Sequence, residues 1–191
     1  MTVDIKPTPI PGCYQIHPRI FTDQRGSFVK TFHQEIFQQH GLHTHFAEEY
    51  YSHSRQNVLR GLHFQLPPQD HVKLVYCTAG EVLDAVVDLR LGSPTYGQVA
   101  TFTLSAENAI ALYIPSGLAH GFYAISEQAT MLYRVSTVYS PEHDAGIRWD
   151  SAGIPWPSAE PILSGRDQAF PTLSEFESPF TYAAPLAAAN V

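Results

Sequence analysis

Short apolar segments of strand length, separated by turn residues, recur along the chain after residue 41. Glycine, proline and serine mark the turns, for example at Gly80, Ser93, Pro115 and Gly117. Beyond residue 80 the expected strands are 82–88, 99–104, 109–114, 120–125 and 131–139. This ladder of short strands predicts a mainly β protein, an antiparallel double-sheet jelly roll (a cupin-like double-stranded β-helix) or a barrel.

The two ends of the chain have a less regular pattern. Prolines interrupt residues 1–31, which predicts edge strands and loops, with a turn at 23–26 leading into a strand at 27–32. Residues 33–41 are the one clear helical candidate, ended by Gly41. We expect a single domain over 1–191, with its core at about 19–171, an irregular segment past 150, a C-terminal tail at 172–191, and mobile last residues.

Composition narrows the class of protein. With 191 residues, 44% apolar and 15% charged, the chain can bury a full core and is not disordered. A net charge of −7 without a basic run argues against nucleic acid or an anionic membrane as the partner. The N-terminus lacks the order of a signal peptide, and Cys13 and Cys77 form no close pair. No apolar run approaches the ~20 residues of a membrane helix, so we expect a cytoplasmic protein.

Polar side chains of several kinds gather in residues 57–65 and 73–77, which otherwise read as two strands. Leu62 and Phe64 alternate with His63 and Gln65, so the two polar side chains are expected on the opposite face of the strand. A lone histidine on a strand is more often a satisfied core residue. Here its neighbours favour a site, and we expect His63 to face a cavity.

Histidines in a jelly roll raise the possibility of a metal site. A metal-binding cupin would offer two histidines one residue apart and then a glutamate shortly before a glycine. The matching positions hold His63, Gln65 and Lys73, and an ammonium group repels a divalent cation. His120 adds a second histidine, but two histidines without a carboxylate make a poor site. We therefore expect no catalytic metal and no other cofactor.

A fixed cation near a base suits a reaction in which negative charge develops on oxygen. Proton abstraction beside a carbonyl is such a reaction, because it produces an enolate with negative charge on oxygen. A cation already placed near that oxygen stabilises the enolate. His63 is a suitable base near neutral pH, and Lys73 supplies the cation. Inversion also needs an acid on the opposite face, for which Tyr133 and Tyr139 are candidates, although tyrosines among strands more often pack in a core. A loop aspartate such as Asp167 commonly serves a turn.

Blocks of residues spread along the chain carry a resemblance to a known family. They are 57–65, 73–75, 88–90, 93–97, 104–108, 114–115, 119–122, Tyr133, 139–141, 154–157 and 163–167. By these blocks, which occur in family order, the chain resembles the dTDP-4-dehydrorhamnose 3,5-epimerase family from about Arg19 to Pro171. The resemblance implies a metal-independent jelly-roll homodimer that epimerises a nucleotide-linked 4-keto-6-deoxy sugar at carbons 3 and 5, in deoxysugar biosynthesis for cell-surface polysaccharide.

The resemblance also implies a role for individual residues. By position, His63 is similar to the base, Asp167 to the carboxylate that orients it, and Lys73 to the group that stabilises the enolate. Tyr133 resembles the acid on the opposite face, and Tyr139 the ring that stacks on the nucleobase. The substrate-binding set expected on this basis is Arg25, Arg60, Gln65, His120, Tyr139, Glu48, Lys30 and Asp144, with guanidinium groups suited to the diphosphate.

The departures from the family pattern lie on the nucleotide side. The family usually has a glutamate where Lys30 stands, and glutamine and asparagine where Glu48 and Tyr50 stand. A cytosine, whose exocyclic amine a carboxylate such as Glu48 could accept from, is one possible replacement for thymine. One alternative is therefore the same chemistry on a sugar linked to another nucleotide, for example CDP. Two others are an enzyme that inverts one carbon only and a sugar-binding jelly roll without turnover.

Overall fold

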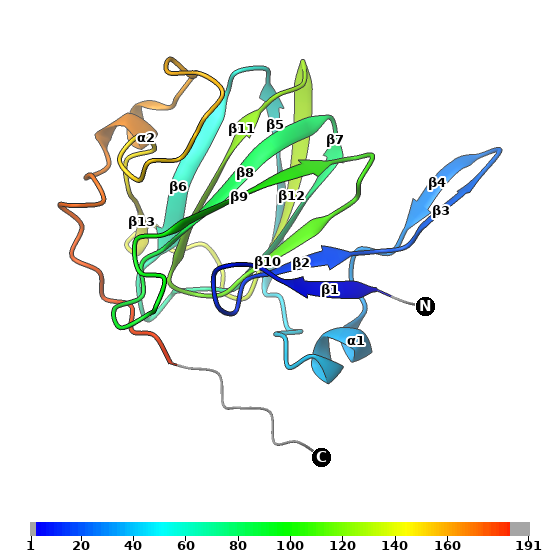
Figure 1. The fold of residues 1–191 in the computed structure, drawn as a ribbon, viewed down its shortest axis with the longest axis horizontal. Helices are drawn as coiled ribbons and strands as arrows, with labels where there is room; N and C mark the ends of the chain where they lie inside the picture. The colour runs from blue at the N-terminus through cyan, green and yellow to red at the C-terminus, as the bar shows by residue number, and fades with distance from the viewer. Residues whose placement is uncertain (1–2, 184–191) are drawn as a thin grey trace.

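Two antiparallel sheets packed face to face form the body of the molecule (Figure 1). The structure, a computed structural model, describes residues 3–183. One sheet contains, in spatial order, β1 (Asp4–Pro7), β2 (Tyr14–His17), β10 (Ala111–Ile114), β7 (Lys73–Ala79), β12 (Gln128–Val135) and β5 (Glu48–Arg55). The other contains β13 (Asp144–Gly146), β6 (Leu59–Gln65), β11 (Leu118–Ala124), β8 (Glu81–Asp88) and β9 (Val99–Ser105). The expectation of a mainly β jelly roll is confirmed.

Apolar side chains from both sheets meet in the space between them. They include Val75 of β7, Val86 of β8, Leu104 of β9, Phe122 of β11 and Met131 of β12, each at most 1% exposed. Burying a side chain of this size stabilises the fold by roughly 1.5–3 kcal/mol relative to leaving it in water. The core therefore fixes how the two sheets lie on each other, and with it the relative positions of side chains that enter from opposite sheets.

The outer faces of both sheets are covered as well. Helix α1 (Gln34–Gln39) inserts Phe37 beside Tyr113 of the larger sheet, with ring centroids 6.4 Å apart. Gly41 follows this helix with a φ of 66°, a left-handed conformation that glycine adopts without strain. On the other sheet, Leu62 and Phe64 pack beneath the C-terminal segment. No helix among the described residues is long and apolar enough to cross a membrane.

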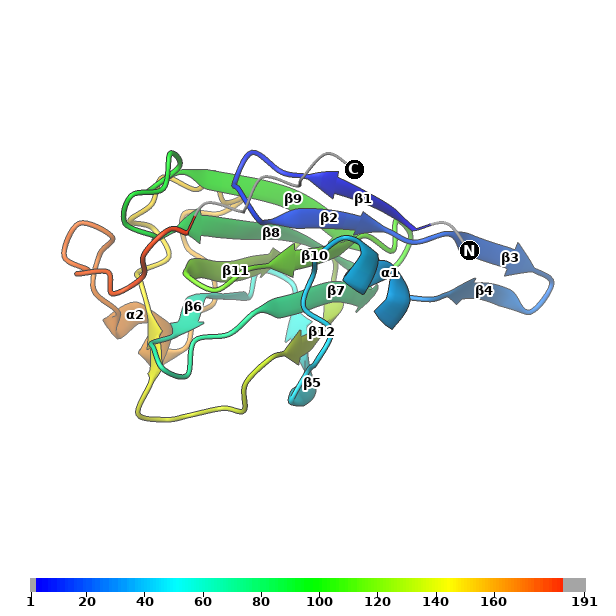
Figure 2. The ribbon, with the colours of Figure 1, turned by 90° about the horizontal axis from the view of Figure 1, so that it is seen from below.

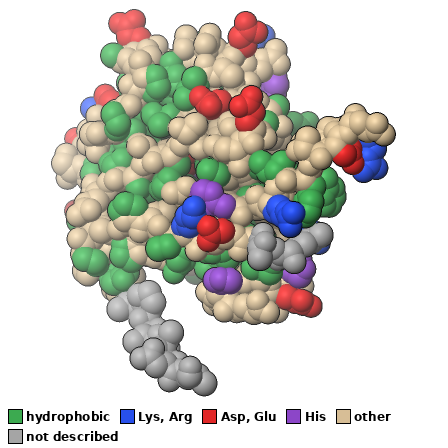
Figure 3. Space-filling model, turned by 45° about the vertical axis from the view of Figure 1, so that its right-hand side comes forward, with side chains coloured by type: hydrophobic (Ala, Val, Ile, Leu, Met, Phe, Trp, Pro, Cys, Tyr) green, Lys and Arg blue, Asp and Glu red, His purple; other side chains and the backbone are tan. Residues whose placement is uncertain are grey.

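A two-stranded arm, β3 (Ile20–Asp23) and β4 (Gly26–Val29), projects away from the body (Figures 1 and 2). Its apolar side chains Ile20, Phe21 and Phe28 are 38%, 37% and 59% exposed. Figure 3 shows hydrophobic side chains along the arm and charged ones at its tip.

The structure differs from the sequence expectations in two elements. The strand expected over 131–139 ends at Val135, and a second helix, α2 (Gly165–Ala169), occupies the segment expected to be irregular. Ile10 and Phe180, which lie outside the expected core of about 19–171, are also buried, at 1% and 3% exposed. Residues 184–191, where mobility was expected, lie outside the described residues.

Candidate active site

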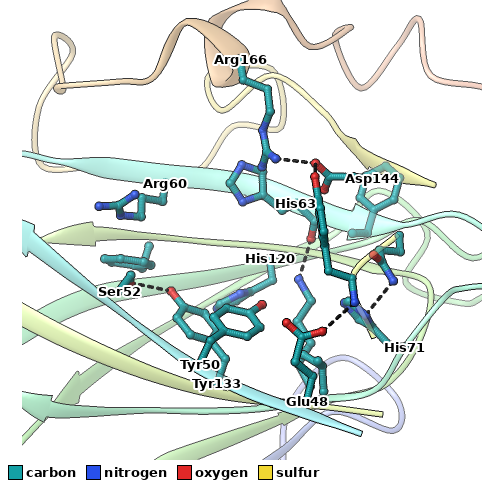
Figure 4. A pocket seen from close by; sticks show the side chains of 16 residues that line it. Glu48, Tyr50, Ser52, Arg60, His63, His71, His120, Tyr133, Asp144 and Arg166 are labelled. Carbon is teal, nitrogen blue, oxygen red and sulfur yellow. Dashed lines mark hydrogen bonds and ion pairs between the residues drawn. The ribbon is translucent and has the colours of Figure 1, made fainter. Parts of the chain in front are cut away.

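A cavity of about 360 Å³ opens between the sheets and contains most of the residues expected to form the site (Figure 4). This size lies within the range of small-molecule pockets. Strands β6 and β11 form one wall and β5, β7 and β12 the other. The expected residues that line it are Glu48, Arg60, His63, Gln65, Lys73, His120, Tyr133, Tyr139 and Asp144.

His63, the residue expected as the base, is bonded to Asp167 as expected. Its Nε2 donates to Asp167 Oδ1 at 2.8 Å, which leaves Nδ1 with a lone pair. Burial lowers the pKa of His63 from its ordinary value, although Asp167 acts in the opposite direction. The imidazole is therefore neutral near pH 7, the form in which it can accept a proton. Burial alone would raise the pKa of Asp167, but its bonds to His63 and its neighbours lower it, so this carboxylate stays ionised.

Helix α2 places Asp167 beside His63. Ser164 caps the helix by accepting from the Asp167 amide at 3.1 Å, and Gly61 N donates to the second carboxylate oxygen at 3.3 Å. Phe170, which ends the helix, meets the His63 ring edge to face with centroids 5.7 Å apart. The imidazole is thus held both by a hydrogen bond and by an aromatic contact.

Close contact between β6 and β11 brings the histidines of these strands into register. A Cβ on Gly121 would lie 2.7 Å from Arg60 O, so no larger residue fits there. His63 and His120 are register partners across this contact. His120 Nε2 donates to Asp84 Oδ2 at 2.8 Å, and Asp84 is completely buried. The two histidines therefore project from neighbouring strands, each fixed by its own carboxylate.

Lys73 enters from the opposite sheet, at the start of β7. Its Nζ donates to the backbone carbonyl of His63 at 3.0 Å, and the residue is 6% exposed. Burial lowers the pKa of Lys73 to about 8, while Asp144 and Asp84 favour the charged form. At neutral pH the ammonium group is a cation with few competing water molecules, close to the His63 backbone.

Tyr133 lies across the cavity from His63 (Figure 4). It projects from β12, whereas His63 projects from β6 of the other sheet. Tyr133 is 8% exposed, and burial raises its pKa well above the ordinary value of a tyrosine. Its hydroxyl lies 3.3 Å from Ser52 Oγ, and its ring stacks on Tyr50. The phenol is therefore protonated at neutral pH.

The open side of the cavity is lined by charged and aromatic groups. Tyr139 lies on the loop after β12, not on a strand, and is 55% exposed. Its backbone amide donates to Glu48 Oε2 at 2.7 Å, and its hydroxyl donates to Asp144 Oδ2 at 3.4 Å. Arg166 of α2 also bonds Asp144. Arg60 Nε donates to Ser54 at 3.0 Å. Guanidinium groups on this side suit the recognition of phosphate.

Gln65 lines the cavity, but its amide is used within the chain. Its Nε2 donates to Gln69 O at 2.7 Å, and its Oε1 accepts from Ser140 N at 2.7 Å. These bonds connect β6 with the loop that carries Tyr139. Gln65 therefore fixes this loop, and its expected contact with substrate stays a prediction.

Arg25 and Lys30 are not brought to the cavity within this chain. Arg25 lies at the turn of the β3–β4 arm, where its side chain pairs with Asp23 at 2.6 Å. Lys30 follows β4 directly, and neither residue lines the cavity. Their expected role as substrate ligands stays a prediction.

Sequence reasoning missed several residues of the site. Asp84 and Ser52 carried no local motif, because an aspartate and a serine on strands are ordinary until their register is known. Arg166, which also lines the cavity, was missed as well, although its position next to Asp167 could have indicated it. His71 also lines the cavity, and burial lowers its pKa to about 3. Among the described residues, no group of three or more histidine, cysteine or acidic side chains could hold a metal ion.

A base with its orienting carboxylate, a buried cation and a phenol on the far wall face one cavity in a jelly roll, which is the architecture of a carbohydrate epimerase. Comparison with known proteins identifies the family. The model of the dTDP-4-dehydrorhamnose 3,5-epimerase family matches residues 7–175, and the chain belongs to this family. The expected family and the expected enzyme class, an isomerase, are confirmed.

Individual relatives cover nearly the whole chain. The dTDP-4-dehydrorhamnose 3,5-epimerase of Salmonella typhimurium is 43% identical over 179 residues, which cover 92% of this chain and 97% of the relative. The dTDP-6-deoxy-D-glucose-3,5-epimerase of Legionella pneumophila, solved with dTDP-4-keto-L-rhamnose, superimposes with a TM-score of 0.90 at 37% identity, covering 95% and 100% of the two chains. A 3'-monoepimerase from Streptomyces bikiniensis, solved with dTDP-quinovose, gives 0.84 at 35% identity, covering 88% and 87%.

Proposed function

We propose that the protein epimerises a dTDP-linked 4-keto-6-deoxy sugar at carbons 3 and 5. The observation that carries this proposal is the placement of His63 and Tyr133 on opposite walls of one cavity, with Lys73 beside the base (Figure 4). A keto sugar held between these walls can lose a proton to one, and the planar enolate that forms can receive a proton from the other. Inversion of configuration requires this arrangement.

The reaction begins at His63. Its Nδ1 takes the proton from the carbon next to the keto group, the carbon–hydrogen electron pair moves into the new carbon–carbon double bond, and the keto oxygen becomes an enolate. Asp167 supports this step because its carboxylate stabilises the imidazolium that forms. A base near neutral pKa commonly contributes about a hundredfold to ten-thousandfold in rate.

Lys73 stabilises the enolate oxygen. Its ammonium group is already buried and already bonded to the His63 carbonyl, so little reorganisation is needed when the charge develops. His120, held by Asp84, offers a second polar group on the same side of the cavity as His63. We propose that Lys73 and His120 hold the keto oxygen in place through both inversions.

Tyr133 completes each inversion. Its hydroxyl gives a proton to the opposite face of the enolate carbon, the double bond returns its electrons to that carbon, and the keto group reforms. The raised pKa of Tyr133 keeps the proton available until the carbanion-like carbon takes it. Exchange with water then restores the phenol and the neutral imidazole before the second carbon reacts.

Deuterated water tests this function directly. With dTDP-4-keto-6-deoxyglucose as substrate, the protein is expected to place deuterium at carbons 3 and 5 and to invert both. Label at one carbon would identify a single epimerase, an alternative that the similarity to a 3'-monoepimerase keeps relevant. No label at either carbon, with the nucleotide sugar still bound, would identify a sugar-binding protein without turnover.

The nucleotide handle is a separate point of the proposal. Relatives are named for dTDP sugars, whereas Glu48 places a carboxylate on the nucleotide side of the cavity. One of its oxygens already accepts from Tyr139 N at 2.7 Å, which leaves the other to accept from a base. A competition experiment between dTDP- and CDP-linked substrates measures which nucleotide the protein prefers. A large preference for the CDP sugar would replace dTDP in the proposal.

We also propose that the protein is a homodimer in which Arg25 and Lys30 serve the partner's site. The β3–β4 arm, which projects from the body in Figure 2, exposes Ile20, Phe21 and Phe28. Its turn contains Arg25, which does not line the chain's own cavity. Light scattering should give twice the chain mass. Both cysteines are free, which suits a reducing compartment, and we place the reaction in the cytoplasm.

Mixing two inactive variants tests the exchange of arms. Arg25→Ala and His63→Ala are each expected to lose activity as pure dimers. If Arg25 acts on the partner's site, a mixed dimer contains one cavity with both residues intact, and unfolding and refolding the two variants together restores part of the rate. If Arg25 acts within its own chain, no cavity in the mixture is intact and no activity returns.

A further inference from the structure

The inward face of edge strand β5 carries a row of alternate residues, each of which contacts a side chain or backbone group of the site. Alternate residues of a strand share one face, so this row follows from the register of β5. The contacts are Glu48 with the amide of Tyr139, Tyr50 with the ring of Tyr133, Ser52 with the hydroxyl of Tyr133, and Ser54 with the guanidinium group of Arg60.

Two members of the row act on Tyr133. Tyr50 is its direct register partner across β5 and β12. The rings are nearly parallel, with an interplanar angle of 17° and centroids 4.8 Å apart. Offset stacking at this separation is a favourable arrangement for two aromatic rings. Tyr50 is 41% exposed and Tyr133 8%, so the outer ring covers the inner one.

Ser52 holds the other end of the same side chain. Its Oγ lies 3.3 Å from the Tyr133 hydroxyl, and Figure 4 shows this bond beside the stacked rings. The Tyr133 side chain is therefore fixed twice, by a stacking partner on its ring face and by a hydrogen bond at its oxygen. On the far side His120 meets the same ring edge to face at 6.2 Å.

An acid that inverts a carbon has a stricter requirement than a base that exchanges a proton. The proton must arrive at one face of the enolate before water or the base returns one to the other face. Displacement of a reacting group by about 1 Å can cost roughly a hundredfold in rate. A covered and doubly fixed phenol meets this requirement, whereas a phenol free to rotate in water does not.

We propose that Tyr50 is a positioning residue for the general acid: its ring holds Tyr133 in the plane required for protonation and keeps water from that face of the phenol. The inference rests on the proposed epimerase function. Tyr50 itself transfers no proton in this scheme, because its ring and not its hydroxyl makes the contact.

The strand supplies its own control. Tyr51 is the next residue of β5, points to the opposite face and is 72% exposed. Tyr50→Ala removes the stacking ring, Tyr50→Phe keeps the ring without its hydroxyl, and Tyr51→Ala removes a ring of equal size from the outer face. The three variants are compared with the parent in deuterated water, by measuring label incorporation and inverted product at carbons 3 and 5.

The quantity that decides is the ratio of inversion to exchange within each variant. Partial unfolding lowers both numbers together and leaves the ratio unchanged, so a purely structural loss is recognisable. We expect Tyr50→Ala to lower the ratio roughly tenfold to a hundredfold while label incorporation falls only a few-fold. We expect Tyr50→Phe and Tyr51→Ala to match the parent.

Two results would overturn the inference. One is an unchanged ratio in Tyr50→Ala, and the other is an equal loss in Tyr50→Phe, which would assign the effect to the hydroxyl. The parent protein distinguishes these failures from a failure of the proposed function. If the parent neither exchanges nor inverts, the epimerase proposal is wrong. If the parent does both and Tyr50→Ala keeps its ratio, only the positioning role is wrong.

Discussion

His63 and His120 are register partners on neighbouring strands, yet each donates to a different buried aspartate at the same 2.8 Å. Asp167 arrives from helix α2, and Asp84 from the adjacent strand β8. Because a hydrogen bond to a carboxylate fixes both the tautomer and the ring plane, two imidazoles on one wall are held in known orientations. The wall of the cavity that carries the proposed base is therefore held rigidly at both histidines.

His63→Ala is expected to abolish deuterium exchange at both carbons and to leave nucleotide binding nearly unchanged, because the imidazole acts on the sugar. NMR measures the loss of deuterium exchange, and calorimetry measures the retained affinity for the nucleotide. Full exchange in this variant would remove His63 from the mechanism.

Asp167→Asn gives a milder change with a pH signature. Asp167 raises the pKa of His63, so its replacement lowers that pKa further. The acidic limb of kcat/KM, which reports the protonation of the base, is expected to move to lower pH while the plateau falls. A pH–rate profile checks both. An acidic limb that moved upward would contradict the assignment of His63 as the titrating group.

Lys73→Met is expected to reduce turnover and to stabilise the fold. Burial lowers the pKa of Lys73 to about 8, below the ~10.4 of an unfolded lysine, so at neutral pH the folded state carries a charge that burial disfavours. The shift corresponds to a cost of roughly 3 kcal/mol below pH 8. This cost falls as the pH rises from 8 toward 10, because the unfolded state then binds more protons than the folded one.

Urea unfolding of the parent and Lys73→Met at pH 7 and pH 10 measures this difference. The variant should be the more stable at pH 7, and the difference should shrink at pH 10. Parent turnover should also decline as the ammonium group deprotonates above pH 8. A variant less stable than the parent at both pH values would show that the Lys73 charge is not disfavoured by burial.

Tyr133→Phe should separate exchange from inversion. Without the phenol, His63 or water returns the deuteron to the original face, so label still enters while little inverted product forms. Losing a general acid commonly costs about a hundredfold to ten-thousandfold in the step it serves. Product analysis in deuterated water gives both numbers. If Tyr133→Phe inverts at the parent rate, Tyr133 is only a packing residue and another group is the general acid.

Treatment with a strong chelator is expected to leave the rate unchanged. Gln65 and Lys73 occupy the positions where a metal-binding cupin places ligands, and Gln65 is committed to bonds with Gln69 and Ser140. Activity after prolonged dialysis against chelator, with and without added zinc or iron, makes the measurement. Loss on dialysis and recovery with metal would require a different mechanism.

Local patterns predicted the parts of the structure that local patterns determine. Alternation in 62–65 placed His63 opposite Leu62 and Phe64, and these apolar side chains do pack on the outer face of the sheet. Gly41 ends the helix predicted at 33–41, which spans Gln34–Gln39 in the structure. The strand expected to reach Tyr139 stops at Val135, because the following residues bond to Gln65 and Glu48 in a loop.

Long-range register was beyond what a single sequence can supply. Tyr50 pairs with Tyr133 across 83 positions only because β5 adds to the edge of β12 in one register. Asp84 became part of the site only when β8 was aligned beside β11. Helix α2 was missed since five residues are too few to show a helical period. The positions of Arg25 and Lys30 followed from an arm whose direction no local pattern encodes.

The bond between His63 and Asp167 joins residues 104 positions apart, and every strand of both sheets ends by Gly146. During synthesis the whole scaffold therefore leaves the ribosome before the carboxylate that completes the base. A chain cut short before Ser164 would contain every strand of both sheets but lack the carboxylate that supports the imidazole. The same cut would remove Phe176 and Phe180, which cover Leu62 and Phe64 on the outer face of β6, so the segment that completes the base also completes the packing behind it.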